Sequence, residues 1–150
     1  MNGKKKSKPS SQSKKVIQDS GARKHFGTGA VRDISVGKGK PCLLPWEPML
    51  RLAQHYEAGA EKYASRNWEK GIPLSSFQNS AWNHVMKWLA GWLDEDHESA
   101  AMWNIAGYIW TRERIIDGTL PLSLLLEDSD LHPQLINEIL DRTQTVQGGE

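Results

Sequence analysis

Two glutamates near the middle of the chain have a spacing that suits a bound cation. Glu57 and Glu61 are four residues apart, and residues with this spacing lie one turn apart on the same side of a helix. Two carboxylates at that separation repel each other unless a cation lies between them. The small residues 58–60 leave room for a ligand or a partner helix. The pair therefore favours a cation site, and the alternative is an ordinary solvent-exposed pair with Lys62 nearby.

Three further polar residues lie at the start of a later expected helix or within its first turns. Asp96 and His97 are adjacent, and Asn104 follows His97 at a spacing that keeps both on one helix face. An unpaired buried amide costs about 1–3 kcal/mol, so Asn104 needs a partner in its apolar segment. Helical bundles build metal sites from carboxylates on facing helices, and carboxylate and amide ligands favour Mg²⁺ or Mn²⁺ over Zn²⁺. We therefore predict a site for Mg²⁺, with Mn²⁺ as the alternative, whose ligands are Glu57, Glu61, Asp96, His97 and Asn104.

Basic and aromatic residues follow the glutamate pair, and they suit a nucleotide. Acids that hold magnesium beside cations that hold phosphate are what a nucleoside triphosphate requires. Trp68 could stack on a base. His84 occupies an apolar helix face, where the alternative is a hydrogen-bonded core histidine. The predicted substrate-binding residues are Lys62, Arg66, Asn67, Trp68, Lys70 and His84.

The composition limits the classes of protein and partner. The length of 150 residues suits one domain, and the net charge of +1 offers no global attraction to nucleic acid or to an anionic membrane. No apolar run is long enough to cross a membrane. The lone Cys42 excludes an internal disulfide and a cysteine-built zinc site, so we expect a reducing, cytoplasmic setting. All seven tryptophans lie between Trp46 and Trp110, which predicts that the core is formed by this window.

Residue types divide the chain into four segments. Residues 1–20 are predicted to be a disordered basic tail, with contact to nucleic acid as the alternative. Residues 21–45 are rich in Gly and Pro and are predicted to be a loop, either ordered beside an anion or a flexible lead-in. Residues 46–118 are predicted to form the catalytic core, and residues 119–150 a C-terminal extension with a short helix.

Apolar periodicity predicts an all-α fold, a helical bundle of three to four core helices. The expected helices span about residues 47–64, 75–92, 97–116 and 131–142. The alternating pattern of a β-strand is not expected in any segment. Ser75 or Ser76 is expected to cap the second helix. The third helix is apolar nearly all round, which predicts a central position.

Several short motifs occur in the order that is typical of one known family. They are residues 29–33 (GAVRD), 39–41 (GKP), 55–63 (HYEAGAEKY), 66–73 (RNWEKGIP), 80–84 (SAWNH), 94–97 (DEDH) and 100–104 (AAMWN). Over about residues 26–116, the chain resembles the dATP/dGTP diphosphohydrolases of phages, which are related to the MazG-like all-α nucleoside triphosphate pyrophosphohydrolases. The set of motifs in this order indicates the family more specifically than any one motif does.

The resemblance implies an activity and several residue roles. Such enzymes cleave a deoxynucleoside triphosphate between the α- and β-phosphates, release a monophosphate and pyrophosphate, and require a divalent metal. In some phages this reaction adjusts the nucleotide pools for DNA that contains 2-aminoadenine. MazG-like enzymes carry Glu-Glu-x-x-Glu on one helix; Glu57 and Glu61 match its first and last positions, and Ala58 stands at the second. A later Glu-x-x-Asp is matched only in spacing, by Ala101 and Asn104. Glu57 or Glu61 is thereby implied to orient or deprotonate the attacking water.

The resemblance also implies a homo-oligomer, because MazG-like relatives form dimers or larger assemblies. Two other functions are open alternatives. One is a small phage binding module that contacts nucleic acid or a host protein through the basic tail. The other is a phosphohydrolase of the His-Asp type, which would use His84, Asp96 and His97 and release inorganic triphosphate or phosphate. The consecutive His-then-Asp order of that type is missing, since the order here is Asp96-His97.

Overall fold

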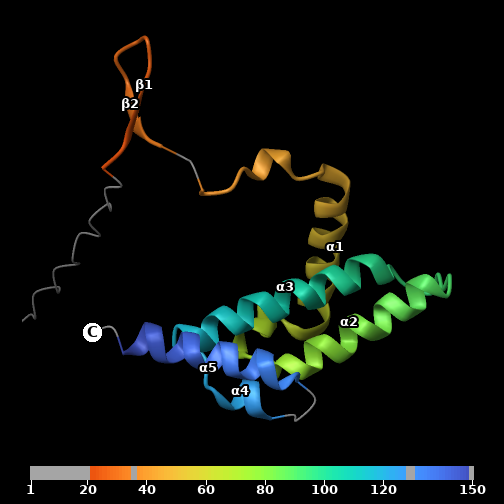
Figure 1. The fold of residues 1–150 in the computed structure, drawn as a ribbon. Helices are drawn as coiled ribbons and strands as arrows, with labels where there is room; N and C mark the ends of the chain where they lie inside the picture. Colours follow the sequence, from red (N-terminus) through yellow and green to blue (C-terminus); the bar gives the residue numbers. More distant parts are fainter. Residues whose placement is uncertain (1–20, 35–36, 128–130, 149–150) are drawn as a thin grey trace, which may run out of the picture. The chain divides into compact units, whose positions relative to one another are not determined.

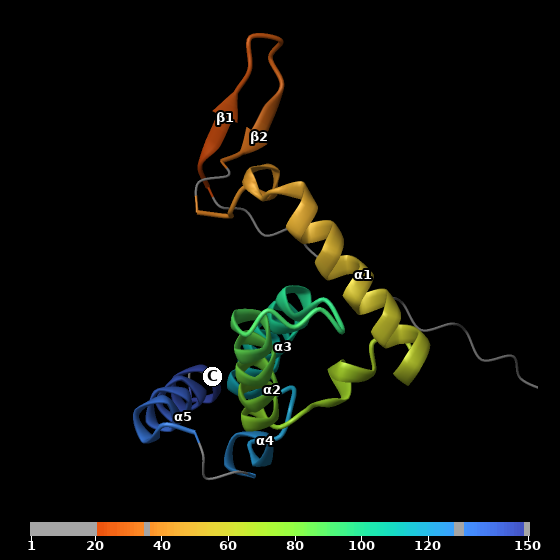
Figure 2. The same cartoon turned by 90° about the vertical axis from the view of Figure 1, so that its right-hand side faces the viewer.

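The computed structural model describes residues 21–34, 37–127 and 131–148 (Figures 1 and 2). The predicted basic tail, residues 1–20, lies outside the described residues. The chain divides into two units, Met1–Leu43 and Leu44–Glu150, and each is described by itself.

The first unit contains a short β-hairpin, so the prediction that this segment lacks strands is wrong. Strand β1 (Arg23–His25) pairs antiparallel with β2 (Val31–Asp33), and Arg23, opposite Asp33, forms a salt bridge with it. The connecting turn depends on glycine, because Gly29 has a φ of +85°. A single 3₁₀ turn, η1 (Pro41–Leu43), follows. The alternating pattern was missed because each strand has only three residues.

The second unit has helices and no strand among its described residues, which confirms the predicted all-α fold. Its elements are α1 (Trp46–Tyr63), the 3₁₀ helix η2 (Asn67–Lys70), α2 (Leu74–Leu89), α3 (His97–Ile116), α4 (Ser123–Leu126) and α5 (Pro133–Gln147). Among the described residues, no helix is both long enough and apolar enough to cross a bilayer.

Helix α3 is the central element, as its composition predicts. Asp96 caps its N-terminus by accepting a hydrogen bond from the Ser99 backbone N–H at 3.0 Å. Helices α1, α2, α4 and α5 all contact α3, and α1 and α5 lie on opposite sides of the α2–α3 pair (Figure 2). The two ends of α3 agree with the expected bounds of 97–116.

Helix α2 differs from its prediction at both ends. It begins at Leu74 after an N-cap at Pro73 with no side-chain capping bond, so the predicted Ser75 or Ser76 cap is wrong. It ends at Leu89, three residues before the expected position. The cause is Gly91, whose φ of +75° cannot continue a helix.

The buried core extends beyond the tryptophan window, which corrects the expectation that this window forms the core. Trp46, Trp82, Trp88 and Trp92 are all at least half exposed. The buried apolar cluster instead joins α2, the end of α3 and the C-terminal extension, and consists of Leu74, Ile115, Ile116, Leu125, Leu131 and Ile139. The extension is therefore part of the folded unit, because its apolar residues cover the last turn of α3.

Gly107 sets the closest approach between α2 and α3. A Cβ atom at this position would meet the Cε1 and Cζ atoms of Phe77, with Cζ only 2.8 Å away. The Phe77 side chain is almost fully buried, so it has little room to move.

We expect Gly107→Ala to destabilise the fold by about 1–3 kcal/mol, because an added methyl group overfills a packed core. Urea unfolding measures this change. Gly59→Ala in α1 is the matched control: a Cβ there meets no atom within 4 Å, and alanine favours a helix over glycine by up to about 1 kcal/mol. An unchanged urea midpoint for Gly107→Ala would contradict the close packing of α2 on α3.

Candidate functional site

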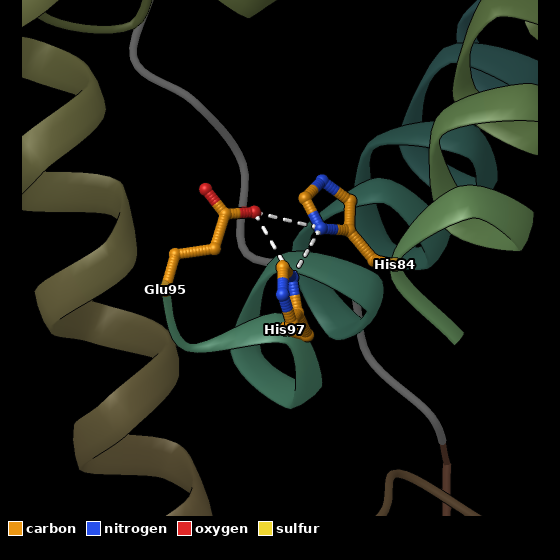
Figure 3. A group of neighbouring side chains, drawn as sticks. All are labelled: His84, Glu95 and His97. Atoms are coloured by element: carbon orange, nitrogen blue, oxygen red, sulfur yellow. Dashed lines mark hydrogen bonds and ion pairs between the residues drawn. The ribbon is translucent and has the colours of Figure 1, made fainter. Parts of the chain in front are cut away.

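Three side chains from two helices and their connection bring their polar atoms together (Figure 3). His84 belongs to α2, His97 is the first residue of α3, and Glu95 lies in the connection between them. The Oε1 atom of Glu95 is 2.8 Å from Nδ1 of His84 and 3.2 Å from Nδ1 of His97. The two Nδ1 atoms are 3.2 Å apart. We call these three residues the His–Glu–His cluster.

The turn that ends α2 explains why Glu95 lies next to His84. After α2, the Gly91 N–H donates to the Trp88 carbonyl at 3.0 Å, and the Trp92 N–H donates to the Lys87 carbonyl at 3.0 Å. This pair of bonds is a Schellman motif, which requires the left-handed conformation that Gly91 supplies. The motif turns the chain back, so that the residues before α3 pass the end of α2.

His97 is the buried anchor of the cluster. Its side chain is only 1% exposed, and its Nε2 atom lies 2.8 Å from Oδ1 of Asp94. An ionised carboxylate can only accept, so Nε2 carries the proton and donates it. This hydrogen bond lowers the pKa of Asp94 below its usual value. In the neutral ring, the Nδ1 atom of His97 then presents a lone pair to His84 and Glu95.

Burial favours the neutral form of His84. Partial burial lowers the pKa of the His84 imidazole, and this effect outweighs the opposite effect of the Glu95 carboxylate. A neutral imidazole beside a second imidazole and a carboxylate is a donor set that can hold a divalent cation.

Asp96 has a different partner from its neighbours. The Nε and Nη2 atoms of Arg51 donate to its two carboxylate oxygens at 2.8 and 2.6 Å, and Nη2 also contacts Glu98. The hydrogen bonds from Arg51 lower the pKa of Asp96 to about 2. This two-pronged contact ties α1 to the start of α3, and it occupies the carboxylate that was predicted to hold a metal.

A cavity of about 650 Å³ lies among α1, η2 and Trp103 of α3. Its walls include the aromatic rings of Tyr56, Trp68 and Trp103; the Tyr56 ring centre is 5.8 Å from that of Trp68 and 6.1 Å from that of Trp103. The segment that leaves α1 is strained, since Ala64 and Arg66 have φ angles of +80° and +58°. Strained backbone of this kind is characteristic of binding sites.

The comparisons with known proteins now bear on these two features. The family described as "dATP/dGTP diphosphohydrolase, N-terminal" matches residues 28–118. The chain belongs to this family. The name of the family indicates hydrolase activity on dATP and dGTP, and the matched residues include both the cavity and the His–Glu–His cluster. No curated protein and no solved structure gives a significant match.

Several residues predicted for the diphosphohydrolase site lie at the cavity. Glu57, Arg66, Asn67 and Trp68 line it. Glu61 is exposed one turn further along α1.

The other predicted residues do not form one site, and each has its own surroundings. His84 and His97 meet in the cluster. Lys62 lies over the Tyr63 ring, and Lys70 is exposed at the end of η2. The Asn104 Nδ2 donates to the Ala100 carbonyl at 2.9 Å, so its amide is satisfied within its own helix.

Two residues of the cluster region were missed in the sequence. From their position before a helix, Asp94 and Glu95 are expected only to favour the positive end of the helix dipole. The available signal was their position, because both carboxylates lie in the short segment between a helix-ending glycine, Gly91, and His97, which begins the next helix. That pattern allows the acids to fold back on His97.

We expect Arg51→Met to lower the Tm at pH 7 by at most about 4 °C, because solvent screens this partly exposed pair. The pKa of Asp96 is depressed in the fold to about 2. The pair therefore stabilises the fold fully above about pH 4, the ordinary pKa of aspartate, and loses this effect as the pH falls towards 2. Thermal unfolding from pH 7 to pH 2.5 measures the difference between the two proteins.

Asp96→Asn is the matched variant, since asparagine keeps the helix cap and removes the charge. Arg51→Met should lower the Tm by less in the Asp96→Asn protein than in the wild type. Fully additive effects on Tm at pH 7 would contradict the pairing.

Proposed function

We propose that this chain hydrolyses dATP or dGTP to the deoxynucleoside monophosphate and pyrophosphate, with a divalent cation. The observation that carries the proposal is the aromatic cavity of about 650 Å³ within the part of the chain that the family matches. A cavity of this size is in the range of small-ligand sites.

The cavity has the chemistry that a purine nucleotide needs. The rings of Tyr56, Trp68 and Trp103 can stack on a base, because every base has a π face. Arg66 lines the same cavity, and its guanidinium suits a phosphate oxygen. We propose that Lys62 and Lys70 add positive charge for the rest of the triphosphate, with Asn67 as a hydrogen-bonding partner.

The carboxylates of α1 supply the acid–base chemistry in this proposal. Glu57, at the cavity wall, or Glu61 orients a water for attack on the α-phosphorus and accepts its proton. The bond to the β-phosphate then breaks, and pyrophosphate leaves. The same two glutamates offer the oxygen atoms that Mg²⁺ or Mn²⁺ prefers. When bound, such a cation neutralises the negative charge that develops on the phosphates.

We further propose the biological setting that the resemblance suggests. In a phage whose DNA contains 2-aminoadenine, this reaction would remove dATP and supply dGMP in the host cytoplasm.

We expect dGTP or dATP incubated with Mg²⁺ to give the monophosphate and pyrophosphate in equal amounts. Ion-exchange chromatography of the products measures both. Glu61→Gln should lower turnover at least about 10²-fold, which is about 2.7 kcal/mol of transition-state stabilisation. Glu127→Gln is the control, because Glu127 is an exposed acid outside α1.

A second product pattern would support a different reaction. Release of the deoxynucleoside with inorganic triphosphate would overturn the proposal and favour the His-Asp type of phosphohydrolase. The observation that favours this second candidate is the contact between His84 and His97. Full turnover of Glu61→Gln would remove Glu61 from the site.

We also propose that the chain forms a homo-oligomer through α2 and α3. Trp82, Met86 and Leu89 share one face of α2 and are 65%, 48% and 69% exposed. On α3, Ile105 and Ile109 are about half exposed. Exposed apolar side chains in this number are typical of a protein interface, and a second copy of the same face would cover them.

Light scattering after gel filtration is expected to give a multiple of the chain mass of 16.9 kDa. The double change Trp82→Glu and Met86→Glu should reduce the measured mass to that of one chain, because it places charges in an apolar interface. Asn137→Glu, on the exposed side of α5, is the control. A wild-type protein that elutes as a single chain would contradict this proposal.

A further inference from the structure

We propose that His84, Glu95 and His97 bind a divalent transition-metal ion, through a set of ligands that includes neither Glu57 nor Glu61. The proposal stands on the geometry of the His–Glu–His cluster and does not depend on the nucleotide activity.

The three donor atoms have the separations of neighbouring metal ligands. Nδ1 of His84, Nδ1 of His97 and Oε1 of Glu95 form a triangle with edges of 2.8, 3.2 and 3.2 Å. Donors about 2.1 Å from one ion are about 3.0 Å apart on an octahedral face and about 3.4 Å apart on a tetrahedral face. A single ion above this triangle can therefore reach all three atoms without a large rearrangement.

The inner atoms of the cluster can all act as ligands. With Nε2 of His97 donating to Asp94, the neutral ring offers the lone pair of Nδ1, and the Glu95 carboxylate offers Oε1 at 3.2 Å from it.

The residue that lies behind the cluster supports the same conclusion. Asp94 holds the outer nitrogen of His97 at 2.8 Å, and a carboxylate in this position fixes the tautomer and orientation of a metal-ligating histidine. The ring of His97 is held in place before any ion arrives, because its side chain is 1% exposed.

The donor types select the class of ion. Imidazole nitrogen suits Zn²⁺ and later first-row ions such as Co²⁺ and Ni²⁺, whereas Mg²⁺ prefers oxygen ligands and keeps most of its waters. Three protein donors leave further coordination positions open. Those positions face solvent, because Glu95 is 47% exposed and His84 is 22% exposed. Water or a phosphate oxygen can occupy them.

The test is a titration of the tag-free full chain with Co²⁺ and with Zn²⁺. It uses a Cys42→Ser background, because the exposed thiol of Cys42 would bind both ions. Calorimetry gives the stoichiometry, and the visible absorption of Co²⁺ reports nitrogen ligation. We expect one ion per chain, an increase in Tm because the ion binds the folded state, and no displacement by millimolar Mg²⁺.

Variants assign the site to these residues. Glu95→Gln keeps the shape of an exposed side chain and should weaken Co²⁺ binding at least tenfold, and His84→Gln should abolish the absorption band. Asp94→Asn should weaken binding about 10- to 100-fold. His132→Asn is the control, since His132 caps α5, asparagine can also cap a helix, and the change removes a histidine outside the cluster.

Two results would overturn the proposal. One is the absence of stoichiometric binding of either ion to the wild-type cluster. The other is binding that survives both Glu95→Gln and His84→Gln. Because these measurements contain no nucleotide, their failure is distinguishable from a failure of the pyrophosphate assay, and either result can stand alone.

Discussion

The close contact between α2 and α3 is the constraint on which the site depends. Phe77 lies over Gly107, where a larger residue has no room. With the two helices held at this distance, the turn at Gly91 has to reverse the chain within a few residues. The reversal places His84 near the end of one helix opposite His97 at the start of the next. Packing in the interior thereby determines the geometry of polar groups near the surface.

Four acidic residues at the start of α3 have different roles because each has a different partner. Asp94 accepts from His97, and Glu95 lies between the two imidazoles. Asp96 and Glu98 both bind Arg51. A segment with this density of negative charge would repel itself if it were only solvated. Here each acid contacts a histidine or the arginine from α1, and these contacts hold the side chain of each acid in place.

The sequence predicts local features better than those that depend on chain reversal or docking. The bounds of α3 follow from its apolar composition. The Glu57 position at the cavity wall is compatible with its predicted helix face. In contrast, Glu95 contacts its partners only because the turn at Gly91 reverses the chain toward α2. The apolar periodicity of the sequence does not predict that turn. The buried cluster was misplaced for a similar reason, since Ile139 reaches the core only when α5 docks on α3.

Because of the C-terminal helices, the folded domain extends beyond the segment that the family matches. The family match ends at residue 118, whereas Ile115 and Ile116 are covered by Leu125, Leu131 and Ile139. The segment recognised by its motifs is thus shorter than the segment that excludes water from the core. A relative that shares the motifs but differs after this point must shield the same end of α3 with another element. In evolutionary terms, the segment matched by the family can change its C-terminal cover only if the replacement is equally apolar.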